Sequence, residues 1–179
     1  MAAPRRGGLG RCGGGAGWAG AAGMTLPAWN PYGCGMVEVK IKPSDWSDPD
    51  VQELLGDWGT NSRGGATVIA VDFSPPFGSF LTARIAGRPA GCVGIRKLEP
   101  LTAEVKRLLV ASEARGQGLG NQLLAAAEVE ARRLGYRTIV LDTDGSDHAA
   151  LALFRRAGFS DTDDFNGNEL ARFWFRKDL

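Results

Sequence analysis

Residues 104–121 read EVKRLLVASEARGQGLGN, and this stretch decides the fold. Its first part, up to Val110, is rich in leucine and valine and predicts a buried strand. After a short turn, apolar residues recur at helical spacing from Leu119 to Leu134, with Glu128 and Glu130 expected largely on the other faces of the helix. Glycines at this junction let the first backbone N–H groups of the helix face outward, where they and the helix dipole favour a phosphate. Arg115 adds a positive charge beside them.

Two common phosphate-binding motifs fit this loop poorly. A P-loop needs Gly-Lys-Ser/Thr, and the chain has no such tripeptide. The dinucleotide pattern G-x-G-x-x-G finds its first two glycines in Gly116 and Gly118, but its third position is Asn121. Asp142 ends the next predicted strand at a suitable distance, so a dinucleotide remains an alternative. That fold needs repeated βαβ units, however, and only one is evident.

Length and composition narrow the class of protein. A chain of 179 residues with a net charge of +1 suits one domain and gives no electrostatic reason to expect a nucleic-acid or membrane partner. Cys12, Cys34 and Cys92 form no CxxC pair, and His148 is the single histidine, so we expect no metal site. The unpaired cysteines favour a reducing, cytoplasmic location.

The first 35 residues differ from the rest of the chain. Residues 1–35 are dominated by glycine and alanine, and we expect a disordered extension. Arg5 and Arg6 resemble a twin-arginine signal, but no apolar run follows them. Patterned sequence begins at Met36, which is a candidate for the natural start, and residues 36–179 are expected to form a single domain.

Within that domain the patterns predict strands and helices in an α+β order. The strand at 102–110 changes its apolar phase between Val105 and Leu108, which predicts a bulge. The other expected elements are a strand at 37–42, a helix opened by Pro49 and capped by Asp48 or Ser47, a strand at 67–71, a hairpin of 79–85 and 90–97, the helix from Leu119 to Gly135, a strand at 137–141, a short helix capped by Asp147 and closed by Gly158, and final strands at Phe165 and at 173–175.

The pattern Arg-x-x-Gly-x-Gly, at Arg115, Gly118 and Gly120, resembles the acetyl-CoA loop of the GNAT superfamily of N-acetyltransferases. Residues 151–159, LALFRRAGF, are similar to the A-x-x-L-Y-x-x-x-G-F signature of that family, and residues 91–94 look like the end of its third strand. The resemblance covers residues 37–179. It implies a three-layer α+β fold with a central, mixed but mostly antiparallel twisted sheet of about six to seven strands, flanked by helices, and acetyl-CoA as co-substrate.

In this family the pantetheine arm lies where the fourth and fifth strands separate, and the pyrophosphate lies on the glycine loop. The chain departs from the family at Phe154, where a tyrosine often reprotonates the thiolate, and at Asp147, where an asparagine is common. The resemblance implies an acetyl-CoA site made of Leu108, Leu109, Val110, Arg115, Gly116, Gln117, Gly118, Leu119, Gly120, Asn121, Asp147 and Phe154.

Glu104 is the candidate catalytic base. It lies four residues before Leu108, on the strand where several GNAT enzymes keep a glutamate, and it could act through a water. The alternative is a surface residue paired with Lys106 or Arg107. A backbone N–H near Val110, freed by the bulge, would polarise the thioester carbonyl.

The remaining reactive residues have simpler interpretations. His148 at a helix start is expected on the surface. Cys92 is expected as a small buried hydrophobe, which gives little support to an acyl-cysteine intermediate. Direct transfer in a ternary complex is therefore the expected mechanism. Asp142 and Asp144 could hold a cationic acceptor or could be turn residues.

Two functions follow from these observations. The first is transfer of an acetyl group to a primary amine of a small molecule or protein. The second is a non-catalytic acyl-CoA-binding regulatory module, which Phe154 would permit. A homodimer could form through an exposed edge strand near Phe173.

Overall fold

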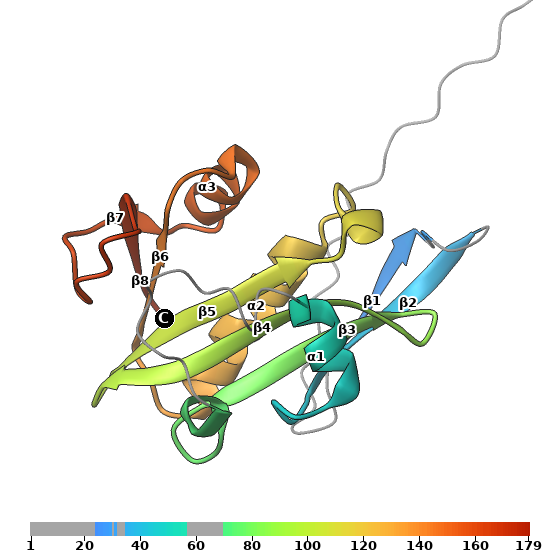
Figure 1. Cartoon of the computed structure of the whole chain (residues 1–179), viewed down its shortest axis with the longest axis horizontal. Helices are drawn as coiled ribbons and strands as arrows, with labels where there is room; N and C mark the ends of the chain where they lie inside the picture. Colours follow the sequence, from blue (N-terminus) through green and yellow to red (C-terminus); the bar gives the residue numbers. More distant parts are fainter. Residues whose placement is uncertain (1–23, 30, 32–34, 57–69) are drawn as a thin grey trace, which may run out of the picture.

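The computed structural model describes residues 24–29, 31, 35–56 and 70–179. Their strands form one mixed sheet in the order β1-β2-β3-β4-β5-β6-β8-β7 (Figure 1). Only β5 and β6 pair in parallel, and every other neighbouring pair in this part of the chain is antiparallel. The strands are β1 Met24–Trp29, β2 Met36–Pro43, β3 Ser79–Ile85, β4 Arg88–Glu99, β5 Thr102–Val110, β6 Thr138–Thr143, β7 Ser160–Asp161 and β8 Phe173–Asp178.

Helices cover both faces of the sheet. On one face, α2 (Leu119–Arg133) and α3 (His148–Arg156) close the larger apolar core, which includes Leu123, Leu151 and Ile139. On the other face, α1 (Pro49–Leu55) and the short 3-10 helix η3 (Ala70–Phe73) close a smaller one. A second 3-10 turn, η4 (Ser112–Ala114), precedes α2. The predicted α+β architecture of a sheet between two helical layers is confirmed.

Local signals in the sequence explain several of these elements. The Asp48 carboxylate accepts a hydrogen bond from the backbone of Asp50 and caps α1, as predicted. Asp147 caps α3 in the same way through Ala149 and Ala150. The hairpin of β3 and β4 turns at Ala86 and Gly87, which both have positive φ, the geometry of a tight two-residue turn. None of the described helices is long and apolar enough to cross a membrane.

Four expectations about the elements were wrong. A strand, β1, forms at residues 24–29, where no element was expected, because it pairs along its full length with β2. Val71 belongs to η3 rather than to a strand. Phe165 lies in the loop between β7 and β8, because the partner strand of β8 is the earlier pair Ser160–Asp161. Phe173 does not lie on an edge strand, because β8 is enclosed between β6 and β7.

The polar face of α2 also differs from expectation. Glu128 and Glu130 are buried, at 9% and 1% exposure, although their spacing suggested solvent-facing sides of the helix. Each is buried with a cation: both Glu128 oxygens lie 2.7 Å from Lys177 Nζ, and Glu130 accepts two hydrogen bonds from Arg133. Ion pairing explains how these charges are tolerated inside. The predictions for residues 67–69 and for Cys12 and Cys34 lie outside the described residues.

Candidate acetyl-CoA and acceptor site

The parallel strands β5 and β6 separate partway along their length. Their register runs from Thr102–Thr138 to Glu104–Val140 and stops there, although β5 continues to Val110 and β6 to Thr143. On its other side, β5 stays paired with β4 as far as Val110, opposite Gly91. The edge of β5 that faces β6 therefore has backbone groups beyond Glu104 without a ladder partner in β6. Such groups need hydrogen bonds from another source.

A bulge interrupts β5 at the start of this gap. Lys106 pairs with Gly94 and Leu109 with Cys92, so Arg107 and Leu108 together oppose the single residue Val93. Arg107 has a φ of 56°, which confirms the bulge predicted from the apolar phase shift. The bulge changes the direction of Leu108, Leu109 and Val110, which are all half-buried.

The glycine loop leads from the end of β5 into α2. Gly116 and Gly118 have φ values of 74° and 81°, and Gly118 is the N-cap of α2 without a side-chain cap. A Cβ at either glycine would meet no heavy atom within 4 Å, so the space above the loop is open. Arg115 is exposed, and its Nε donates to the Val110 carbonyl at 3.1 Å. Open space, helix N–H groups and a neighbouring guanidinium suit a phosphate.

The other predicted cofactor residues lie in varied surroundings. A Cβ at Gly120 would come within 3.3 Å of Leu153, so a glycine lets α2 approach α3. Leu119 is buried in the core, Gln117 is half-buried and Asn121 is exposed. Asp147 uses its carboxylate to cap α3. Phe154 is buried, and its ring centroid lies 5.6 Å from that of Phe175 and 6.3 Å from that of Phe159. The cofactor roles assigned to these residues stay predictions.

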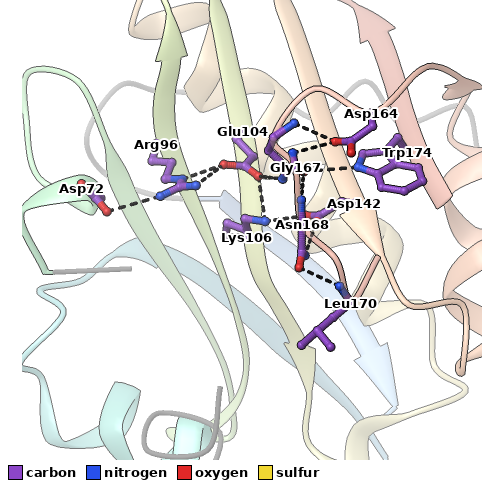
Figure 2. A network of polar contacts seen from close by, with 11 residues as sticks. Asp72, Arg96, Glu104, Lys106, Asp142, Asp164, Gly167, Asn168, Leu170 and Trp174 are labelled. Carbon is purple, nitrogen blue, oxygen red and sulfur yellow. Dashed lines mark hydrogen bonds and ion pairs between the residues drawn. The ribbon is translucent and has the colours of Figure 1, made fainter. Parts of the chain in front are cut away.

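Glu104 lies on the α1 side of the sheet at the centre of a buried polar cluster (Figure 2). Its side chain is 0% exposed. Its Oε2 lies 2.6 Å from both Nε and Nη2 of Arg96, the residue opposite it on β4. Its Oε1 lies 2.7 Å from Lys106 Nζ and accepts a hydrogen bond of 3.0 Å from Asn166 Nδ2. The pairing with Lys106 is therefore present, but the alternative of a surface position for Glu104 is wrong, because its side chain is enclosed by its polar partners. The catalytic role of Glu104 remains a prediction.

The cluster continues across the gap to β6. Lys106 also pairs with Asp142 Oδ1, and Asn168 donates to Asp142 Oδ2. Burial raises the pKa of Asp142, but Lys106, Asn168 and Asn166 together outweigh that effect and hold the pKa below its ordinary value. Asp142 is thus a buried, charged group, with 3% of its side chain exposed.

The loop between β7 and β8 brings its two asparagines onto this cluster (Figure 2). The Asp164 carboxylate accepts from the backbone N–H groups of Asn166 and Gly167 and so fixes the turn. Trp174 of β8 donates its indole N–H to Asn166 Oδ1 at 3.2 Å. Asn166 and Asn168 therefore lie against the polar cluster on the α1 side of the sheet.

On the other side of Glu104, the cluster borders the smaller apolar core. Arg96 also reaches Asp72 of η3 at 3.5 Å. Burial lowers the pKa of Arg107, an effect that the nearby Cys92 opposes and Arg96 reinforces. Burial also raises the pKa of the Cys92 thiol to about 12, with Arg107 acting in the opposite direction. Cys92 is 0% exposed, which confirms the prediction of a small buried hydrophobe.

His148 and Asp144 both lie on the surface. His148 is exposed at the start of α3, as predicted. Asp144 is exposed, and its carboxylate accepts from the backbone and hydroxyl of Ser146, so it is a turn residue.

The sequence patterns did not predict two of the three partners of Glu104, Arg96 and Asn166. They also did not predict Asn168 and Trp174, which bind Asp142 and Asn166 in the same cluster. The cross-strand pair Arg96–Glu104 was accessible in principle, because a tight hairpin sets the register of two opposite charges. The loop residues carry no periodic signal that places them over β5.

The sequence matches that of a known protein family. The model of the acetyltransferase (GNAT) family matches residues 37–159. The IAA acetyltransferase of Azospirillum brasilense is 39% identical over 87 residues, which are 48% of this chain and 57% of that protein. The chain spans about half the length of the curated relatives that it matches.

Solved structures agree on the fold. The GNAT domain of S. lividans PAT has a TM-score of 0.66 at 18% identity, covering 91% of this chain and 100% of that one. A GNAT family acetyltransferase from Elizabethkingia anophelis, solved with acetyl-CoA bound, has a TM-score of 0.61 at 22% identity. The match covers 79% of this chain and 98% of that one. The separated strands, the glycine loop and the family match lead to one conclusion: this chain belongs to the acetyltransferase (GNAT) family.

Proposed function

We propose that this chain is an acetyl-CoA-dependent N-acetyltransferase that transfers the acetyl group directly to a primary amine of a small molecule or protein. The observation that carries the proposal is the separation of β5 from β6 next to the open glycine loop. An extended amide chain such as pantetheine can pair with the free edge of β5, as a strand would. The solved relative with acetyl-CoA bound has the same fold.

Within this proposal the acetyl-CoA residues are those of the sequence prediction. The backbone of Leu108, Leu109 and Val110 binds pantetheine, and residues 115–121 bind the pyrophosphate. A freed N–H at the bulge polarises the thioester carbonyl, and one such donor is typically worth about 3–4 kcal/mol in the transition state. Asp147 and Phe154 complete the proposed set.

The acceptor amine approaches from the α1 side, where the carboxylates gather. Glu104 is the proposed base, and a positioned base contributes roughly 10²–10⁴-fold to the rate. Asp142 supplies a second buried negative charge next to the gap. Two carboxylates favour an acceptor that arrives as an ammonium ion.

The experiment is an acetyl-CoA-dependent mass-gain screen of pooled amino acids, polyamines, aminoglycosides and peptides, run with the full chain and with Glu104→Gln. We expect one acceptor to gain an acetyl group. In the variant, turnover should fall by roughly 10²–10⁴-fold while acetyl-CoA binding survives. Unchanged turnover in Glu104→Gln would remove Glu104 as the base.

A non-catalytic acyl-CoA-binding module is the second candidate. It is favoured by Phe154, which packs in the core and has no proton to donate to a leaving thiolate. This candidate predicts that acetyl-CoA binds but that no amine in the screen gains mass.

A further inference from the structure

Glu104 has no free position for a substrate or a water. Its two oxygens offer about four acceptor sites. Arg96 takes two at Oε2, and Lys106 and Asn166 take the two at Oε1. With 0% of the side chain exposed, no solvent reaches it either. If Glu104 is the base of the proposed function, its proton must arrive through one of these three partners.

The three partners differ in whether they can pass a proton. A guanidinium keeps its protons in proteins, so Arg96 can hold Glu104 but cannot transfer to it. The side-chain amide of Asn166 does not titrate. The ammonium of Lys106 can give one proton and take up another. Lys106 is therefore the one partner among these three that can deliver a proton to Glu104.

Lys106 also has the right position. It lies two residues beyond Glu104, and Asp142 lies two residues beyond Val140, the last register pair of β5 and β6. The ion pair of Lys106 with Asp142 thus spans the gap where the backbone pairing has just ended. Its side chain is 19% exposed, so solvent reaches Lys106 but not its enclosed partner Glu104.

We propose that Lys106 is the proton relay between the acceptor amine and Glu104, an inference that rests on the proposed acetyl transfer. Lys106 passes one proton to Glu104 and, as a neutral amine, takes one from the acceptor ammonium. The acceptor nitrogen then bonds to the thioester carbon while the carbon–sulfur bond breaks. Of the two protons that the nitrogen loses, one ends on Glu104 and later returns to water through Lys106, and the other protonates the coenzyme A thiolate.

The charged groups around the relay are compatible with this role. Glu104 faces Lys106 from the same strand, and Asp142 faces it from β6. Beyond Glu104 lie Arg96 on β4 and Asp72 on η3. The two carboxylates hold the ammonium in place between transfers, and Asn168 holds Asp142.

The test compares Lys106→Arg with Lys106→Met in the full chain. The substrates are the acceptor that gains an acetyl group in the screen and propylamine as a generic amine. Arginine keeps the positive charge between Glu104 and Asp142 but cannot release a proton. The relay predicts that both variants lose roughly 10²–10⁴-fold in kcat/KM near pH 7.5. It also predicts that both recover with unit slope as the pH rises towards about 10, where the free amine is already deprotonated.

Lys177→Arg is the matched control. Lys177 is 23% exposed and pairs with the buried Glu128 on the other side of the sheet, so the same exchange there tests structure alone. We expect activity within twofold of wild type for this control. Acetyl-CoA affinity and Tm are measured for every variant.

Each outcome decides the proposal. Wild-type activity in Lys106→Arg, or a deficit that stays constant with pH, would overturn the relay and leave Lys106 a structural cation. Loss in both variants with recovery at high pH supports it. A wild-type chain that acetylates no amine would overturn the proposed function and the relay together, whereas retained activity in Lys106→Arg overturns the relay alone.

Discussion

Successive residues of β5 serve opposite faces of the sheet, and the two faces are held together differently. Ala103 and Val105 enter the apolar core beneath α2, where burial from water supplies the stability. Glu104 and Lys106 lie on the α1 side, in a cluster of charges that is almost as well enclosed. The same backbone carries both sets of side chains, so the packing of the apolar face also holds Glu104 and Lys106 in position.

The largest expected effect comes from removing the charge at the centre of the polar face. Glu104→Ala leaves Arg96 and Lys106 without their shared carboxylate, and breaking a buried pair typically costs about 3–5 kcal/mol. Val105→Ala, the neighbouring change on the apolar face, removes two methyl groups and should cost about 2 kcal/mol. Urea unfolding of both variants measures the difference. An equal or smaller loss for Glu104→Ala would mean that the charges contribute little beyond filling space.

Two glycines of β4 extend the comparison, because each marks a close approach on one face. A Cβ at Gly91 would lie 2.7 Å from the Leu109 carbonyl oxygen and 2.9 Å from Leu123, on the α2 side. A Cβ at Gly94 would lie 2.5 Å from the ring of Phe73, on the α1 side. Either alanine substitution should cost about 1–3 kcal/mol through overpacking.

The two glycine variants should differ in ligand binding. Gly91→Ala pushes on the backbone of Leu109, which is proposed to hold pantetheine, whereas Gly94→Ala pushes on a side-chain ring. We therefore expect weaker acetyl-CoA binding in Gly91→Ala alone, measured by calorimetry. Equal affinity in the two variants would count against a role for this part of β5.

The sequence predicted the apolar packing well and the buried charges of both faces poorly. Periodicity located β5, the bulge and α2, because apolar spacing reflects which side of an element is buried. It failed for Glu128 and Glu130, since spacing cannot show that a buried charge has a partner from β8 or from the same helix. The contacts of Asn166 and Asn168 depend on how a loop returns over the sheet, which no local pattern encodes.

Acid should weaken both faces through one carboxyl on each. Asp142 on the polar face and Glu130 of α2 both have pKa values below their ordinary ones. Burial raises the pKa of each group. For Asp142 this effect is outweighed by Lys106 and two asparagines, and for Glu130 by Arg133 and Ser79. A carboxyl with a lowered folded-state pKa stabilises the protein above its unfolded pKa, and this contribution is lost as the pH falls through the folded value.

Asp142→Asn and Glu130→Gln should therefore each flatten the loss of unfolding free energy below about pH 5, because the titrating group is gone. Urea titrations from pH 3 to pH 7 measure the slope. A slope as steep as that of wild type in either variant would show that its carboxyl is not linked to folding.

The smallest effect tests whether the polar face is as closed as the apolar one. Cys92 lies on the α1 side next to Arg107, is 0% exposed, and has a pKa raised to about 12, mainly by burial. Because the thiolate is the reactive form, iodoacetamide at pH 8 should leave Cys92 unmodified in the folded chain and modify it in urea. Peptide mass spectrometry separates Cys92 from the other two cysteines of the sequence. Rapid modification without denaturant would mean that the α1 side opens readily, and then water could reach Glu104 without passing through Lys106.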